Sequence, residues 1–279
     1  MSSLTISRFA PSPTGDLHLG NIRTAIAARE IAGEGARFIV RMEDLDRLTS
    51  RREWAARQLE DLAAVGVFSD SAIVYQSERF ELYQTELARL YERDLTYECY
   101  CTRKEIQQAT AAPHGALPRY PGTCRELSER QRRTRAAGRP AAIRLRAPRE
   151  MSDSGHFGDI VLVRNDGVPA YNLAVVVDDE LQGVTQVVRG DDLLHVTPSQ
   201  VYLQKLLGFR TPDYVHLPLV VGPDGQRLSK RHGGVTLSDC MALGFTASEI
   251  RSALLRSLEV GSHGWAPSSS LSEWLKSLL

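Results

Sequence analysis

The order of elements in the N-terminal part of the chain constrains the fold more strongly than any other feature of the sequence. Leu4–Phe9 alternates apolar and polar side chains, which is typical of a strand. The next segment, Pro11–Gly15, contains prolines and a glycine that keep it out of regular structure. Leu19–Ala32 has isoleucines at roughly helical spacing and ends before Gly33, and Arg37–Met42 is typical of a second strand. Strand, loop, helix and strand form a βαβ unit, so the sequence predicts an α/β protein with a nucleotide-binding sheet.

The rest of the chain is expected to continue this sheet around an inserted region. Amphipathic helices are expected at Arg51–Val65 and Arg79–Tyr91, and the chain after Lys230 is expected to be mainly helical. From about Glu98 to Arg149 the composition changes to clustered cysteines, scattered Pro and Gly, and many arginines. Further strands are expected at Gly158–Val163, Leu173–Val177, Gln186–Arg189 and His216–Val220. We therefore expect four parts: a first half of the sheet domain (1–97), an insertion (98–157), a second half (158–240) and a helical C-terminal remnant (241–279).

Composition and charge set limits on the kind of protein. The 34 basic and 34 acidic side chains give a formal net charge of zero, so no overall field favours a nucleic acid, although a local basic face is compatible with this balance. Met1–Phe9 lacks the apolar core of a signal peptide, and no apolar run approaches the length of a membrane span. We expect a cytoplasmic protein that is a monomer.

Two segments contain residue types that bind and move phosphate groups. Pro11–Asn21 lies between the first strand and the first helix, where unpaired backbone N–H groups and the positive helix end suit a phosphate. There His18 can donate a hydrogen bond to a phosphate oxygen, and Gly20 lets a nucleotide approach the backbone closely. In Gly225–Gly234, Lys230 lies on a glycine-flanked loop that can close over a leaving pyrophosphate. Taken alone, His18 is more typical of a loop or core histidine, and Lys230 is more typical of a solvated surface charge. Together, however, the two segments flank the same predicted sheet in the expected order.

Four further stretches accompany these two segments, namely Arg41–Asp46, Tyr171–Ala174, Val176–Asp179 and Arg189–Asp192. With them, the chain resembles the class I aminoacyl-tRNA synthetases of the glutamyl type over roughly residues 4 to 235. The first segment resembles their His-Ile-Gly-His motif, and Leu228–His232 resembles their Lys-Met-Ser-Lys-Ser motif. The resemblance implies a Rossmann-like synthetase catalytic core with a zinc-type insertion. Neither Gly-x-Gly-x-x-Gly after the first strand nor a P-loop motif occurs, which argues against the competing nucleotide folds.

The resemblance implies activation of glutamate, in which the amino-acid α-carboxylate attacks the α-phosphate of ATP and releases pyrophosphate. It assigns glutamate binding to Arg8, Ala10, Ser12, Glu43, Tyr171 and Arg189. It assigns ATP binding, with Mg²⁺ on the phosphates, to Ser12, His18, Gly20, Asn21 and Lys230, of which His18 and Lys230 are catalytic. Glutamate has two carboxylates and one ammonium, for which arginines and a glutamate are fitting partners. An arginine at position 189 favours the acid over glutamine, because an amide cannot offset the burial of a guanidinium.

Three of the four cysteines, Cys99, Cys101 and Cys124, fall within one short window. In a reducing compartment such a cluster indicates a metal rather than disulfides, and three inert buried cysteines are the alternative. The cluster resembles the structural zinc site in the insertion of some glutamyl synthetases, in which Tyr120 is the fourth ligand. His114 lies nearby and is the more usual ligand chemically, so both remain candidates.

We expect no anticodon-binding domain of the glutamyl type, because the 49 residues after Lys230 are too few for one. In this the chain resembles the truncated bacterial paralogues that transfer glutamate to the queuosine base of tRNA(Asp), and Val175 stands where many glutamyl synthetases have a pocket asparagine. The alternatives are an enzyme that charges a tRNA 3′ end, a non-catalytic tRNA-binding paralogue, and another nucleotidylyltransferase of the superfamily. The arginines between Arg130 and Arg149 are equally compatible with RNA phosphate contacts and with a solvated helix face.

Overall fold

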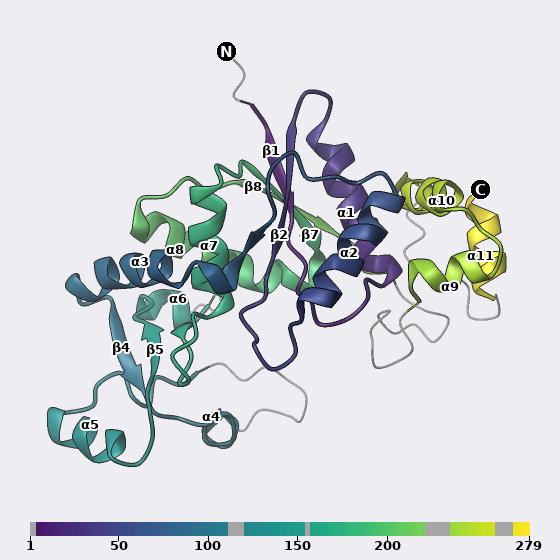
Figure 1. Ribbon diagram of the computed structural model, residues 1–279. Helices are drawn as coiled ribbons and strands as arrows, with labels where there is room; N and C mark the ends of the chain where they lie inside the picture. The colour runs from purple at the N-terminus through teal and green to yellow at the C-terminus, as the bar shows by residue number, and fades with distance from the viewer. Residues whose placement is uncertain (1–3, 111–119, 154–156, 221–234, 260–269) are drawn as a thin grey trace. The chain divides into compact units, whose positions relative to one another are not determined.

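The chain forms two compact units, which are described separately. A computed structural model describes residues 4–110, 120–153, 157–220, 235–259 and 270–279. The first unit comprises Met1–Glu78, Gly183–Leu194 and Pro212–Leu279, and the second comprises Arg79–Gln182 and His195–Thr211. The chain therefore leaves the first unit twice and returns to it twice (Figure 1).

The first unit is built on a five-stranded sheet with the strand order β3-β2-β1-β7-β8. Its strands are β1 (Ile6–Phe9), β2 (Arg37–Met42), β3 (Val74–Tyr75), β7 (Gln186–Gly190) and β8 (Asp213–Leu217). Each neighbouring pair is parallel, as a sheet built from βαβ crossovers requires. The sequence predicted β1 and β7 to within two residues and β2 with its bounds, whereas β8 begins and ends three residues earlier than expected.

The two faces of this sheet differ in chemistry because successive side chains along a strand point to opposite sides. One face carries Phe9, Val40 and Val188, which pack into the main core with residues of helix α1 (Leu19–Ala32). Because Arg8 pairs in register with Ile39 on β2 and with Val187 on β7, it lies on the other face. That second face is therefore partly cationic.

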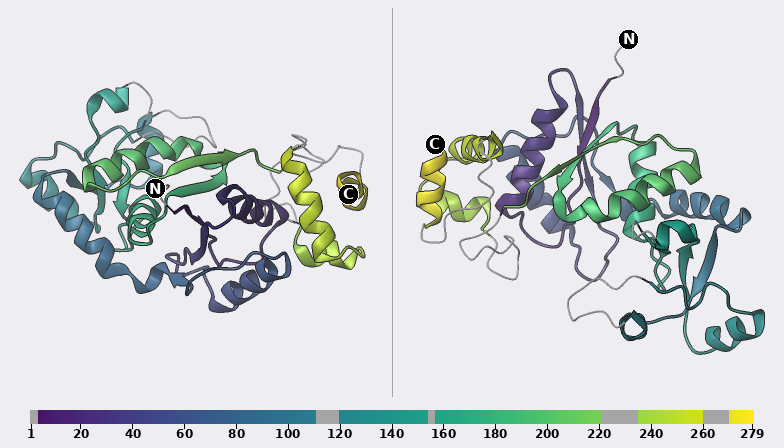
Figure 2. Two further views of the ribbon diagram at one scale, coloured as in Figure 1. Left: turned by 90° about the horizontal axis from the view of Figure 1, so that it is seen from above. Right: turned by 180° about the vertical axis from the view of Figure 1, so that it is seen from behind.

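The helices of the first unit surround the apolar face of the sheet and extend into the C-terminal part. They are α1, α2 (Arg52–Ala64), α9 (Leu237–Ala242), α10 (Ala247–Glu259) and α11 (Leu271–Leu278), with 3-10 turns η1 (Gln76–Glu78) and η2 (Asp191–Val196) nearby. Figures 1 and 2 show α9, α10 and α11 grouped beside α1. A buried arginine fixes this group to the sheet: Arg23 Nε donates to Ser257 Oγ at 2.8 Å, and its Nη1 donates to the carbonyl of Pro218 at 2.8 Å. Burial lowers the pKa of Arg23, although the side chain stays in contact with these oxygens.

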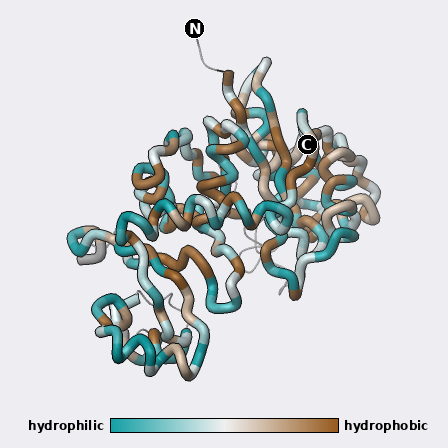
Figure 3. The backbone as a smooth tube through the Cα atoms, turned by 60° about the vertical axis from the view of Figure 1, so that its left-hand side comes forward, coloured by the Kyte–Doolittle hydropathy of each residue, from teal (hydrophilic) through white to brown (hydrophobic). Residues whose placement is uncertain are grey.

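The second unit contains a small antiparallel sheet and a group of helices. The sheet has the order β4-β5-β6, with β4 (Thr96–Cys99), β5 (Ala142–Leu145) and β6 (Val161–Val163). The helices are α3 (Phe80–Glu92), α4 (Arg103–Thr110), α5 (Glu129–Ala136), α6 (Arg149–Asp153), α7 (Tyr171–Leu181) and α8 (Thr197–Leu207). Helix α5 has no buried residue and is mainly teal in Figure 3, as its charged sequence requires. Within the described parts of the chain, no helix of either unit combines the length and apolar character that crossing a membrane requires.

The strand expected at Leu173–Val177 is wrong, because these residues belong to helix α7. All of them are buried, so the apolar run has no polar side that could reveal the helical period. The helix continues into Asp178 and Asp179, which are also buried. A short apolar run of this kind does not distinguish a central strand from a helix with both faces covered.

The buried carboxylate of Asp178 connects α7 to α3. It has no solvent exposure, and it accepts hydrogen bonds from Arg79 Nε at 2.6 Å and from Tyr83 Oη at 2.8 Å. A buried charge is tolerated only when it is paired and hydrogen-bonded. The two helices are therefore held together by an ionic contact inside an otherwise apolar interface.

We expect Tyr83→Phe to lower the free energy of unfolding by about 1.5–3 kcal/mol, because it removes a hydrogen bond to a charged group and leaves part of the carboxylate without a donor. Urea unfolding measures this change. Tyr91→Phe on the same helix is the matched control, since Tyr91 is 75% exposed, and it should change stability by less than about 0.5 kcal/mol. Equal effects of the two substitutions would contradict the structural role of Asp178.

Candidate active site

The predicted catalytic histidine lies at the start of α1. His18 is the N-cap residue of this helix, and its Nδ1 accepts the backbone N–H of Asn21 at 3.2 Å. A ring nitrogen that accepts a hydrogen bond carries no proton, so the neutral imidazole has its proton on Nε2. His18 can therefore donate from Nε2 to an oxygen at the helix N-terminus, which is the role that the motif predicts.

Gly20 is required beside this histidine. A Cβ at position 20 would lie 3.0 Å from the imidazole atoms Cε1 and Nδ1 of His18, which is tighter than ordinary contacts. A side chain here would therefore push the imidazole ring by a few tenths of an ångström. The absence of a side chain at position 20 therefore leaves room for the His18 ring as well as for a nucleotide.

The predicted lysine, Lys230, lies outside the described residues. The described residues on either side of that segment are Val220 and Val235, and both lie at the start of α1. The carbonyl of Val235 accepts the N–H of Leu19 at 2.8 Å, and the Cβ of Val220 is 4.0 Å from the position of a Cβ on Gly20. The nearest described residues before and after the segment that contains Lys230 therefore lie next to the segment that contains His18.

A buried glutamine holds the loop that precedes His18. Gln58 of α2 donates from Nε2 to the carbonyls of Ser12 at 3.1 Å and Gly15 at 2.6 Å. The side chain is 1% exposed. The sequence analysis did not single out Gln58, because a polar residue inside an amphipathic helix gives no sign of a partner more than forty positions away.

Three of the residues predicted for glutamate, Arg8, Glu43 and Arg189, lie on or directly after the strands of the first unit. Arg8 on β1 and Arg189 on β7 are both 4% exposed. They share one face, because Arg8 pairs with Val187 and Arg189 follows two positions later. Glu43 directly follows β2 and lies 3.5 Å from Nη2 of Arg41, whose side chain is fully buried. The structure thus adds Arg41 to the predicted set and gives Glu43 a cationic neighbour.

Arg189 is oriented by two residues of the neighbouring strand β8. Its Nε donates to Nε2 of His216 at 3.3 Å, and its guanidinium carbon lies 4.9 Å from the ring centroid of Tyr214. Burial, and then the charge of Arg189, lower the pKa of His216 below its usual value. A neutral imidazole accepts the guanidinium hydrogen bond without cancelling its positive charge. The sequence analysis placed His216 at the start of an expected strand and left Tyr214 outside it, and it did not show that Arg189 lies in register beside His216.

The remaining predicted residues fall in both units. Ala10 and Ser12 follow β1 in the loop between β1 and α1, which is called the signature loop below. Asn21 lies in the first turn of α1. Tyr171 is the first residue of α7 in the second unit, where the neighbouring Asn172 accepts a hydrogen bond from Gln200 at 3.1 Å.

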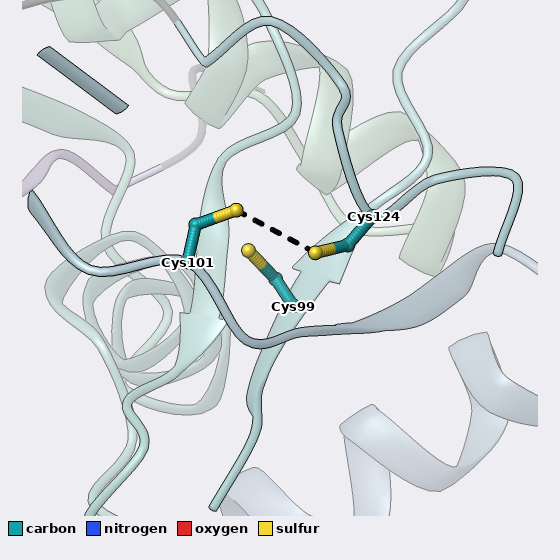
Figure 4. Close-up of side chains that lie close together, drawn as sticks. All are labelled: Cys99, Cys101 and Cys124. Carbon is teal, nitrogen blue, oxygen red and sulfur yellow. Dashed lines mark hydrogen bonds between the residues drawn. The ribbon is translucent and has the colours of Figure 1, made fainter. Parts of the chain in front are cut away.

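The cysteine cluster lies in the second unit, between the end of β4 and the segment that precedes α5. The Sγ atoms of Cys99, Cys101 and Cys124 all lie within 4.8 Å of one another, and Figure 4 shows them pointing toward a common centre. Cys101 Sγ is 3.5 Å from Cys124 Sγ and 3.7 Å from the Tyr120 hydroxyl. Ligands about 2.3 Å from a tetrahedral zinc ion are about 3.8 Å apart, so these separations fit a metal. His114 lies outside the described residues.

The surroundings of the cluster shift the pKa values of Cys101 and Cys124 in opposite directions. Burial raises the pKa of Cys101 to about 11. Burial also acts to raise the pKa of Cys124, but hydrogen bonds from the Tyr100 backbone, Tyr120 and Cys101 outweigh it, and the charge of Arg135 contributes, so the pKa is lowered. A thiolate, not a thiol, binds a metal ion.

The comparisons with known proteins agree with this geometry. The family model of the class I tRNA synthetases (E and Q), catalytic domain, matches residues 5–267. A Glutamyl-Q tRNA(Asp) synthetase of Nocardia farcinica is 55% identical over 262 residues, which cover 90% of this chain and 84% of that protein. A glutamate–tRNA ligase of Syntrophotalea carbinolica is 38% identical and covers 92% of this chain, which spans 57% of the ligase. A solved glutamate tRNA ligase from Elizabethkingia meningosepticum, in complex with its amino acid, has a TM-score of 0.76 at 25% identity over 98% of this chain and 64% of its own.

The fold and the family model define the catalytic domain of a class I tRNA synthetase of the E and Q type. Within this class, the chain belongs to the family of the Glutamyl-Q tRNA(Asp) synthetases. The Rossmann-like synthetase core and the enzyme class expected from the motifs are thereby confirmed. The roles of the individual site residues stay predictions.

We expect Gln58→Leu to lower the free energy of unfolding by about 1–3 kcal/mol, because two loop carbonyls lose their donor. The same change should reduce kcat/KM for ATP by about tenfold or more, since a small displacement of reacting groups is costly. Urea unfolding and ATP–pyrophosphate exchange measure the two effects. Glu60→Leu places the same side chain at an exposed position of α2 and is the control. An unchanged ATP dependence in Gln58→Leu would refute its role in positioning the loop.

Proposed function

We propose that this protein activates glutamate with ATP and transfers the glutamyl group to the queuosine base of tRNA(Asp). The observation that carries the proposal is the 55% identity to a Glutamyl-Q tRNA(Asp) synthetase over 84% of that protein's length. The identity to the glutamate–tRNA ligase is lower, at 38%. The arrangement of charges in the first unit supports the activation step independently of these names.

In the activation step, an oxygen of the glutamate α-carboxylate forms a bond to the α-phosphorus of ATP, and the bond from that phosphorus to the bridging oxygen of pyrophosphate breaks. No proton transfer is needed, so the task of the protein is alignment and charge stabilisation. His18 would donate from Nε2 to a phosphate oxygen as negative charge develops there. Mg²⁺ bound to the ATP phosphates would reduce their repulsion toward the incoming carboxylate.

The cationic face of the sheet accounts for the choice of substrate. Arg8 and Arg189 are buried guanidinium groups on the same face of the sheet, and the carboxylates of glutamate would pair with them. Because His216 is neutral, it orients Arg189 but leaves its charge for the ligand. Glutamine would leave the guanidinium without a counter-charge, so it should bind much more weakly. Glu43 would pair with the substrate ammonium.

The test is transfer of labelled glutamate to three RNAs: tRNA(Asp) with queuosine, the same tRNA without it, and tRNA(Glu). We expect label only on the queuosine-containing tRNA(Asp), and an alkali-sensitive bond that survives removal of the 3′-terminal nucleotide. Glutamate-dependent ATP–pyrophosphate exchange without RNA measures activation separately.

Other patterns of labelling would identify other functions. Label on tRNA(Glu) that is lost with the 3′-terminal nucleotide would show ordinary charging. Exchange without any transfer would show that the protein only activates glutamate. If both exchange and transfer are absent, only a binding role remains.

We also propose that the cysteine cluster holds one structural Zn²⁺ with Tyr120 as the fourth ligand. The Tyr120 hydroxyl oxygen accepts the N–H of Cys124 at 2.8 Å, which directs the oxygen toward the thiols. Arg144 lies over the Tyr120 ring with its guanidinium carbon 3.8 Å from the centroid. Burial and the neighbouring thiols raise the pKa of Tyr120, so the positive charge of an ion would be needed to hold the phenolate. Four protein ligands would leave no open position on the ion, so its role would be structural.

Metal analysis of the purified protein should give about one zinc per chain, and Cys124→Ser should lose most of it, since each ligand is needed for tetrahedral coordination. Tyr120→Phe should weaken zinc retention against a chelator, whereas His114→Ala should not. Cys240→Ala is the control, because Cys240 is buried in the core of the first unit and is not a member of the cluster. Zinc loss in His114→Ala with full retention in Tyr120→Phe would assign the fourth position to the histidine.

A further inference from the structure

The first unit contains a polar cavity that the residues predicted for ATP and glutamate do not account for. Its volume is about 350 Å³, and it lies where the chain passes from the end of β2 to the start of α2. Three arginines line it: Arg47, Arg51 and Arg52. All three are exposed, so an anion can reach them from solvent.

The positive charge of this cavity is not cancelled by its other lining groups. Asp44 is the acidic residue of the lining, and its carboxylate accepts the N–H of Ser77 at 2.8 Å and the Ser77 hydroxyl at 2.6 Å. Arg51 donates from Nη1 to the carbonyl of Ser50 at 2.8 Å and more weakly to that of Arg47, and these are neutral acceptors. The cavity therefore keeps an excess of cationic groups.

Arg52 is held in place by an aromatic ring. Its guanidinium carbon lies 3.4 Å from the ring centroid of Tyr75, which fixes the plane of the group at the cavity. Arg52 also pairs with Glu78, but both side chains of this ion pair are more than half exposed. Exposed pairs contribute little, so another anion can compete with Glu78 for Arg52.

The cavity shares structure with the signature loop. Pro13 of that loop is part of the cavity lining, and its carbonyl accepts the N–H of Arg51 at 3.0 Å. Asp44 is the residue after Glu43, whose own N–H donates to the carbonyl of Pro11 at 2.9 Å. An anion bound here would therefore lie next to the residues predicted to hold glutamate.

We propose that this cavity binds a backbone phosphate of the RNA substrate, on the strand that carries the nucleotide accepting the glutamyl group. The inference rests on the proposed function. A chain with zero net charge has no overall field that holds a polyanion, so RNA must be held by local cationic sites next to the reaction centre. Guanidinium groups with hydroxyls beside them are the side chains that most often contact RNA phosphates.

The test compares the double substitution Arg47→Gln/Arg51→Gln with a control, Arg37→Gln. Arg37 is also an exposed arginine of the first unit, but it lies at the start of β2, opposite the end that leads into the cavity. Two quantities are measured for each protein. The first is the KM for queuosine-containing tRNA(Asp) in glutamate transfer, beside glutamate-dependent ATP–pyrophosphate exchange without RNA. The second is the salt dependence of binding to a fluorescent stem-loop with the anticodon sequence of tRNA(Asp).

We expect the double variant to raise the KM for RNA by about tenfold or more, and any loss in exchange to be at least about tenfold smaller than the loss in transfer. The slope of log Kd against log salt should fall by about 0.7 or more, because each lost phosphate contact removes that much for a single strand. A misfolded variant would lose exchange and transfer together, and would not show the altered slope alone.

Three results would overturn the proposal. An unchanged RNA KM and salt slope would show that the cavity does not contact RNA. A raised KM for ATP in exchange would assign the arginines to the phosphates of ATP. Equal effects in Arg37→Gln would show a general loss of positive charge. If the wild type fails to transfer glutamate at all, the proposed function fails, while the salt slope of stem-loop binding still tests the cavity.

Discussion

The position of the signature loop depends on hydrogen bonds that it receives from other parts of the first unit. Prolines have no backbone N–H, so a loop with two of them must have its carbonyl groups satisfied by donors from elsewhere. The N–H of Glu43 donates to the carbonyl of Pro11, and the N–H of Arg51 donates to the carbonyl of Pro13. The side-chain amide of Gln58 donates to the carbonyls of Ser12 and Gly15. One set of contacts thus fixes the predicted glutamate ligand, the cationic cavity and the approach to His18 together.

The cationic face of the sheet explains why an anionic amino acid suits this core. Three arginines, Arg8, Arg41 and Arg189, are buried on one side of the parallel strands, where desolvation makes an unmatched charge costly. Glu43 lies beside Arg41. Arg189 donates a hydrogen bond to a neutral histidine, and its guanidinium group lies over an aromatic ring. In the proposed function, the carboxylates of glutamate would pair with these guanidinium groups, which a neutral ligand would not do.

Local signals in the sequence predicted some elements well and failed for others for identifiable reasons. Helix α1 was predicted with its observed bounds because Gly33 ends it, and β2 because its apolar run is short and bounded. Helix α7 was mistaken for a strand because neither of its faces is polar at the critical positions. The cysteine cluster was predicted because most of its ligands are close in sequence. Gln58 and His216 were missed because their partners are distant in sequence and depend on strand register and helix packing, which composition and periodicity do not encode.

The residues around the cysteine cluster position its thiols through contacts that do not involve a metal. Buried Asp159 accepts hydrogen bonds from the Tyr97 hydroxyl, from Arg125 at 2.7 Å and from the N–H of Ala147 at 2.8 Å. Tyr97 lies on β4 two positions before Cys99, and Arg125 directly follows Cys124, so one carboxylate connects both segments that supply thiols. A site arranged in this way loses little conformational freedom when an ion binds, which favours affinity. It also means that metal loss should loosen the cluster locally while the strand pairing around it persists, in contrast to small zinc domains that fold only with the ion.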